Sequence, residues 1–106
     1  MEMEGRAVKQ VKVRPGMTVG ELVMELDASG AFNGGALAKA CRITEEMFRD
    51  TGATTYMGLA GAMVPAGMGG IVADLRDRGL VDILVSTGAN LVHDMVEAIG
   101  CNHYHG

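Results

Sequence analysis

Between residues 17 and 50, hydrophobic positions recur at the three- and four-residue spacing that predicts amphipathic helices. The first predicted helix follows Thr18 and ends near Gly30, with an apolar stripe made of Val19, Leu22, Val23 and Leu26. The second is predicted from about residue 34 to 50, and one of its faces carries Leu37, Ala40, Cys41, Thr44, Met47 and Phe48. Gly52 is expected to end it.

The start of the first helix carries a capping-box pattern. Thr18 is the expected N-cap and Glu21 its reciprocal partner, three residues later. Met17 and Leu22 have the spacing of a hydrophobic staple across the same helix start. We therefore expect residues 1–16 to form an extended arm that ends where this helix begins.

After residue 52 the pattern changes to short apolar strands that alternate with helices. The predicted elements are a strand within 53–60, a helix within 66–78 closed by Gly79, a strand within 80–87, and a helix within 91–100 with Asn90 as N-cap. This order implies parallel strands. The predicted fold is α/β, a Rossmann-like parallel sheet portion preceded by two helices. The predicted organisation is one domain over 1–106, with a helical lead-in at 17–52 and a βαβα nucleotide-binding unit at 53–106.

Two loops follow the predicted strands, at residues 58–70 and 87–90. Both lie at the carboxyl edge of the sheet, so we expect them to be neighbours. Five of the residues in 58–70 are glycine, and a helix follows the loop, which favours a nucleotide phosphate as ligand. The spacing matches neither the dinucleotide fingerprint nor the Walker motif. Glycines that only permit tight packing of a helix on a sheet are the open alternative.

Composition narrows the classes of partner. The chain has 106 residues, is 48% hydrophobic and carries a net charge of −4, with its Lys and Arg residues scattered, so we expect neither nucleic acid nor an anionic membrane as partner. Residues 51–73 are uncharged and long enough to span a bilayer, but six glycines and Pro65 argue against it. With two cysteines and no apolar N-terminal run, a cytoplasmic location is expected.

Three stretches of the sequence carry a resemblance to a known family. They are RPGMTVGELVMEL, GAFNGGALAKA and the segment from GAMVPAGMGG through STGANLVHDMVEAIGCNHYHG. From about residue 12 the chain resembles the N-terminal portion of deoxyhypusine synthases, in their archaeal and bacterial branch. Family members are about three times as long, so the resemblance implies a fragment or one piece of a split enzyme. It also implies that the catalytic lysine is absent, because that lysine follows the nucleotide loops.

The resemblance implies an NAD-dependent transferase that works as a homotetramer. Such an enzyme moves the aminobutyl group of spermidine to a lysine of the initiation factor 5A precursor. Two alternatives stay open: transfer to a free amine, as in a homospermidine synthase, and a non-catalytic regulatory subunit of a split enzyme. The residues that match NAD-contacting segments are Gly61, Ala62, Met63, Val64 and Pro65 in the first loop and Thr87, Gly88 and Ala89 in the second.

Some residues depart from the family pattern. Eukaryotic members have Ser-Asn in place of Gly61 and Ala62, and two glutamates that contact polyamine and cofactor in place of Val92 and His93. A neutral imidazole lacks the charge that attracts an amine. We expect His93, at about the third position of its helix, to line the substrate pocket together with Asn90.

The C-terminal residues offer one further reading. Cys101, His103 and His105 alternate, and in an extended segment all three would point the same way, as zinc ligands can. The similar text in the family is not a metal site and no fourth ligand is evident, so we expect no metal.

Overall fold

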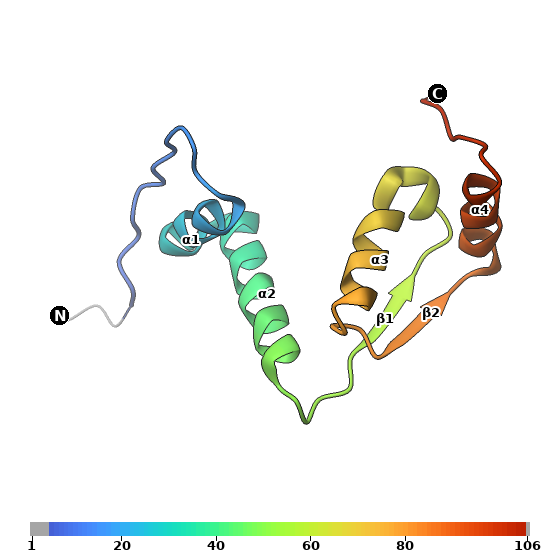
Figure 1. Cartoon of the computed structure of the whole chain (residues 1–106). Coiled ribbons are helices and arrows are strands. Elements are labelled where there is room, and N and C mark those ends of the chain that lie inside the picture. Colours follow the sequence, from blue (N-terminus) through green and yellow to red (C-terminus); the bar gives the residue numbers. More distant parts are fainter. Residues whose placement is uncertain (1–4, 106) are drawn as a thin grey trace. The chain divides into compact units, whose positions relative to one another are not determined.

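The computed structural model describes residues 5–105. It forms two compact units divided between Asp50 and Thr51, each described by itself below (Figure 1). The first unit contains α1 (Val19–Ser29) and α2 (Phe32–Arg49). The second contains β1 (Tyr56–Leu59), the π-helical turn η1 (Val64–Met68), α3 (Gly69–Asp77), β2 (Ile83–Ser86) and α4 (Gly88–Ala98). The prediction of an α/β fold with two helices ahead of a parallel sheet is confirmed.

In the first unit, α1 begins and ends where the sequence predicted. The backbone N–H of Glu21 donates to Thr18 Oγ1 (3.2 Å), and the backbone N–H of Thr18 donates to Glu21 Oε2 (2.8 Å), which completes the capping box. Gly30 ends the helix with a φ of 65°, a left-handed conformation that favours glycine, and its N–H donates to the Leu26 carbonyl. Both signals are local, since each joins residues three or four positions apart.

The α1–α2 hairpin is closely packed because small residues lie between the helices. A Cβ on Gly35 would lie 2.7 Å from the carbonyl carbon and oxygen of Gly30, and a Cβ on Gly34 would lie 3.2 Å from Leu26 Cδ2. Ala38, one turn later, is completely buried. The face of α2 that packs is therefore the small-residue face. The apolar face predicted from Leu37 onward stays largely exposed in this unit.

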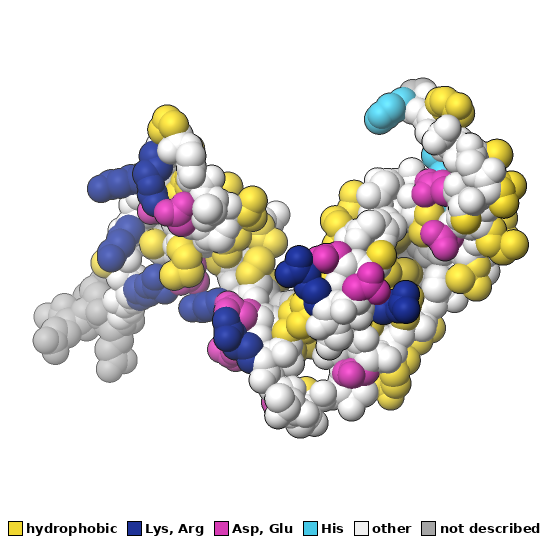
Figure 2. Space-filling view, in the orientation of Figure 1, with side chains coloured by type: hydrophobic (Ala, Val, Ile, Leu, Met, Phe, Trp, Pro, Cys, Tyr) yellow, Lys and Arg dark blue, Asp and Glu magenta, His cyan; other side chains and the backbone are white. Residues whose placement is uncertain are grey.

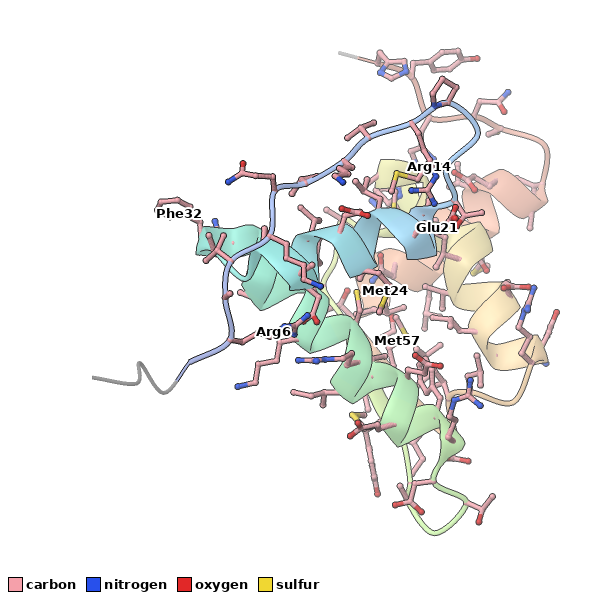
Figure 3. All side chains as sticks on the ribbon, turned by 90° about the vertical axis from the view of Figure 1, so that its left-hand side faces the viewer. Arg6, Arg14, Glu21, Met24, Phe32 and Met57 are labelled. Atoms are coloured by element: carbon pink, nitrogen blue, oxygen red, sulfur yellow. The ribbon has the colours of Figure 1, made fainter. Side chains whose placement is uncertain are left out.

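The second helix starts earlier than predicted, at Phe32 instead of about residue 34. Phe32 has a φ of 50°, and its side chain, which projects outward in Figure 3, is 98% exposed. The arm before α1 forms no helix or strand between residues 6 and 14. It is tied to α1 by a hydrogen bond from the Lys9 N–H to the Ala28 carbonyl (3.1 Å) and by the ion pair of Arg6 with Asp27 (2.9 Å).

In the second unit the two strands pair in parallel. Tyr56 is opposite Ile83, and Leu59 is opposite Ser86, so both strands end at the same edge. Buried hydrophobic side chains are few: among residues 5–105 they are Ala38 in the first unit and Leu59 and Val64 in the second. No helix in that described range has both the length and the apolar character needed to cross a bilayer.

Candidate functional site

The candidate site lies at the carboxyl edge of the sheet, where the loops after β1 and β2 meet. A Cβ on Gly61, in the first loop, would lie 3.3 Å from Thr87 Oγ1 and 3.5 Å from Ala89 Cβ. The predicted proximity of the two loops is thus confirmed. A side chain at Gly61 would press against the Thr87 side chain, so the glycine allows the close approach of the two loops.

Asn90 joins the two loops through both groups of its side-chain amide. Its Nδ2 donates to the Ala60 carbonyl, and its Oδ1 accepts from the Val64 N–H at 3.3 Å. The residue is 2% exposed. A buried amide whose donor and acceptor are both satisfied is a strong structural link, since removing it takes away the partner of the buried Val64 N–H and of the part-buried Ala60 carbonyl. The side chain of Asn90 therefore fixes the first loop against the start of α4.

The prediction that Asn90 caps α4 was wrong. The helix begins at Gly88, with Thr87 in the extended N-cap conformation and no side-chain capping bond. Asn90 is consequently the third helical residue and uses its amide on another segment of the chain. His93 becomes the sixth helical residue, one turn further from the positive end of the helix than predicted. Their roles in substrate binding stay predictions.

Glycine is favoured in the two loops for different physical reasons. Gly67 has a φ of 81°, in the left-handed region that side chains rarely adopt, and it interrupts the helical conformation between Pro65 and α3. The helix predicted within 66–78 is therefore two elements, η1 and α3. By contrast, a Cβ on Gly88, at the N-terminus of α4, would meet no atom within 4 Å. A helix N-terminus with open space beside it is suited to a phosphate.

A cleft of about 200 Å³ opens beside these loops. Its lining includes the loop residues Met63, Val64 and Asn90 together with Arg76 of α3 and Asp94 of α4. Small-ligand pockets usually measure roughly 300–1,000 Å³, so this cleft can hold only part of a dinucleotide. Arg76 could not be selected from the sequence as a lining residue, because its place depends on how α3 packs.

A second polar cluster lies further along α4. The Nδ1 of His93 is 2.9 Å from the Nε2 of His103, and the Nδ1 of His103 is 2.7 Å from Glu97 Oε1. The alternating residues Cys101, His103 and His105 do not converge: within residues 5–105, no three His, Cys, Asp or Glu side chains are placed to hold a metal ion. His103 instead hydrogen-bonds to two side chains of α4, a contact that sequence spacing alone did not indicate.

Comparison with known proteins gives a consistent result. A sequence model described as deoxyhypusine synthase matches residues 21–106. The probable deoxyhypusine synthases 1 of Methanosarcina acetivorans and Methanosarcina mazei are each 54% identical over 99 residues, which cover 93% of this chain and 31% of the relative. A probable deoxyhypusine synthase of Methanothermobacter thermautotrophicus is 38% identical over 97 residues, covering 92% of this chain and 32% of the relative. No solved structure matches. The chain thus spans about a third of the length of these relatives.

Proposed function

This chain belongs to the deoxyhypusine synthase family, in its archaeal branch, and on that premise we propose that it supplies the NAD-binding part of the enzyme. The complete enzyme transfers the aminobutyl group of spermidine to a lysine of the initiation factor 5A precursor. It acts in the cytoplasm as a homotetramer. The chain corresponds to an N-terminal portion of the family, so the acceptor site and the catalytic lysine belong to the remaining polypeptide.

The contact between the two loops is the observation that carries this proposal. Gly61 approaches Thr87 and Ala89 at the carboxyl edge of parallel strands, which is where open α/β sheets bind nucleotides. A Cβ on Gly88 would meet open space, and Gly88 is the first residue of α4, a helix end whose N–H groups and dipole favour a pyrophosphate. These residues fit NAD, which when bound accepts a hydride from the polyamine.

The neighbouring cleft suits the polyamine better than the dinucleotide. Asp94 on its wall can attract a cationic amine, and apolar side chains such as Leu59 and Met63 can contact the methylene groups of an aminobutyl chain. Arg76, which also lines the cleft, carries a positive charge that limits how many amines the cleft can accept. We therefore place one end of spermidine beside Asp94.

The exposed surface of α4 supports the proposal that further polypeptide covers this helix in the complete enzyme. Three large hydrophobic side chains on this helix and one at its C-cap are exposed, namely Leu91, Val92, Met95 and Ile99. Figure 2 shows hydrophobic side chains gathered over α4. Exposed apolar patches of this kind mark interfaces. We infer that the remaining two thirds of the enzyme cover this helix, and that the isolated chain is inactive and poorly stable.

The test uses a complete enzyme that carries this chain. In the chimera, this chain replaces the matching segment of the Methanosarcina acetivorans relative. We expect spermidine-dependent reduction of NAD, measured by absorbance. We also expect formation of deoxyhypusine on the initiation factor 5A precursor, measured by mass spectrometry. Formation of homospermidine from a free amine, with the precursor unmodified, would favour the homospermidine synthase alternative. A folded chimera that binds NAD but performs neither reaction would favour the regulatory subunit.

A further inference from the structure

The His93, His103 and Glu97 cluster has the arrangement of a proton relay. His93 and Glu97 lie four residues apart on one face of α4, and His103 reaches both of them from the segment after the helix. The rings of the two histidines meet edge to face, with centroids 4.9 Å apart. Histidines and carboxylates lie close together near the end of the chain in Figure 2.

The hydrogen bonds determine which nitrogen carries each proton. A carboxylate only accepts, so the Nδ1 of His103 carries the proton that it donates to Glu97. In the neutral His103 the Nε2 is then an acceptor, so the Nδ1 of His93 must be the donor at 2.9 Å. The Nε2 of neutral His93 is consequently left with a free lone pair.

The position of His93 on α4 brings its side chain within one helical turn of the residues that line the proposed polyamine site. His93 lies one turn after Asn90 and next to Asp94, and both of these residues line the cleft. The side chain of His103 is 24% exposed and that of Glu97 is 46% exposed, so the relay runs from a half-buried imidazole to a carboxylate in contact with solvent. Solvent contact at one end lets a proton leave the site.

We propose that His93 takes a proton from an ammonium group of the polyamine, and that His103 and Glu97 position it and carry the proton away. The substrate proton binds to Nε2 of His93, and the proton on Nδ1 of His93 passes to Nε2 of His103. His93 ends neutral in its other tautomer, His103 becomes an imidazolium held by Glu97, and the amine becomes neutral. This inference rests on the proposed function of the same site.

The first test measures the tautomers and does not require activity. In the chimera labelled with ¹⁵N-histidine, the ring nitrogen shifts should show His93 and His103 protonated at Nδ1 under conditions where both are neutral. The His103→Gln variant assigns the signals, and Glu97→Gln should reduce the preference at His103. Signals that place the proton of neutral His93 on Nε2 would overturn the relay, whether or not the chimera is active.

The second test measures turnover with spermidine at saturating NAD. We expect His103→Gln to lower kcat by at least about 100-fold, as loss of proton transfer does, with little change in the KM for NAD. Glu97→Gln keeps an acceptor oxygen but removes the charge, and it should lower kcat by about 10- to 100-fold. His105→Gln is the matched control, because His105 is exposed and lies two residues after His103.

Chemical rescue separates proton transfer from a packing role. In His103→Gly, added imidazole should restore part of the lost turnover, because it can accept a proton on one nitrogen while donating from the other. Pyrrole has the same shape with no basic nitrogen and should not. Equal rescue by both compounds, or a His103→Gln variant as active as His105→Gln, would overturn the relay while the proposed function stands. A folded wild-type chimera without turnover would overturn the proposed function, and the tautomers would still decide the relay.

Discussion

The α1–α2 hairpin and the two loops of the sheet edge are both rich in glycine, but the space beside those glycines differs. In the hairpin the protein's own atoms occupy it, because a Cβ on Gly35 would meet the backbone of Gly30 at 2.7 Å. At the sheet edge Gly61 is close to the second loop, whereas Gly88 faces open space. A glycine beside occupied space serves packing, and a glycine beside open space is available to a ligand. Within residues 58–70, the alternative that a glycine only permits close packing therefore applies in part to Gly61.

The two regions also differ in how their parts are joined. The ends of α1 are fixed by residues close in sequence, such as Thr18 with Glu21. The two loops are held together by one side chain, Asn90, whose backbone partners are 26 and 30 residues away. We therefore expect single changes to have larger effects at the sheet edge than in the hairpin.

The largest expected effect follows from removing this link. Asn90→Ala removes the side-chain partner of the buried Val64 N–H and of the part-buried Ala60 carbonyl, which should destabilise the loops by roughly 3 kcal/mol. Hydrogen exchange of the amides in η1 and the first turn of α4, measured in the chimera, reports this local stability. Asn102→Ala, a change at an exposed asparagine, is the control. Equal protection in both variants would contradict the role of Asn90 as the link.

The next effect concerns packing in the hairpin. Gly35→Ala places a methyl group against the backbone of Gly30, which cannot rotate away as a side chain would, so α1 and α2 should separate at a cost of about 2 kcal/mol. Exchange of the amides in both helices provides the measurement. In Gly20→Ala, also in a helix, the new Cβ meets nothing closer than Thr18 Oγ1 at 4.0 Å, so no loss is expected. Equal loss of amide protection in Gly35→Ala and Gly20→Ala would contradict this packing role of Gly35.

These expectations show what the sequence could and could not provide. The capping box, Gly30 as helix end and the parallel strand order were predictable, because each depends on neighbouring residues or on the order of elements. The start of α4 was not predictable. Asn90 is a residue type that favours the N-cap, and only the folded positions of Val64 and Ala60 explain why its amide binds them instead. The contact of His103 with α4 likewise depends on how the chain continues after the helix.

A smaller effect is expected where open space lies beside a glycine. Gly88→Ala should leave the stability of α4 unchanged, because the new methyl group meets no protein atom within 4 Å. If NAD approaches this helix end, its affinity should fall about tenfold, which is roughly 1.4 kcal/mol. Titration calorimetry of NAD with the chimera measures this. Gly20→Ala, in the first turn of α1 and outside the two loops, adds a Cβ that meets nothing closer than 4.0 Å, so this variant should bind NAD normally. Unchanged affinity in Gly88→Ala would place the cofactor elsewhere.

The smallest effect is a pH dependence confined to the start of α1. Hydrogen bonds from the Thr18 backbone N–H and hydroxyl, and from Arg14, lower the pKa of Glu21 below its usual value (Figure 3). Because the pKa is lower in the folded state, the contribution to stability is present above the unfolded pKa. It is lost as the pH falls through the folded pKa.

We expect the protection of the first amides of α1 to decrease between pH 6 and pH 3, after correction for intrinsic exchange rates, and to be weaker and nearly constant in Glu21→Gln. Glu46→Gln, at an exposed glutamate of α2, should retain the wild-type profile. Asp27, whose pKa is lowered by its hydrogen bond with Arg6, lies near the other end of the helix, so its titration should change protection there instead. A Glu21→Gln variant with the wild-type profile at the first turn would show that the capping box does not set this pH dependence.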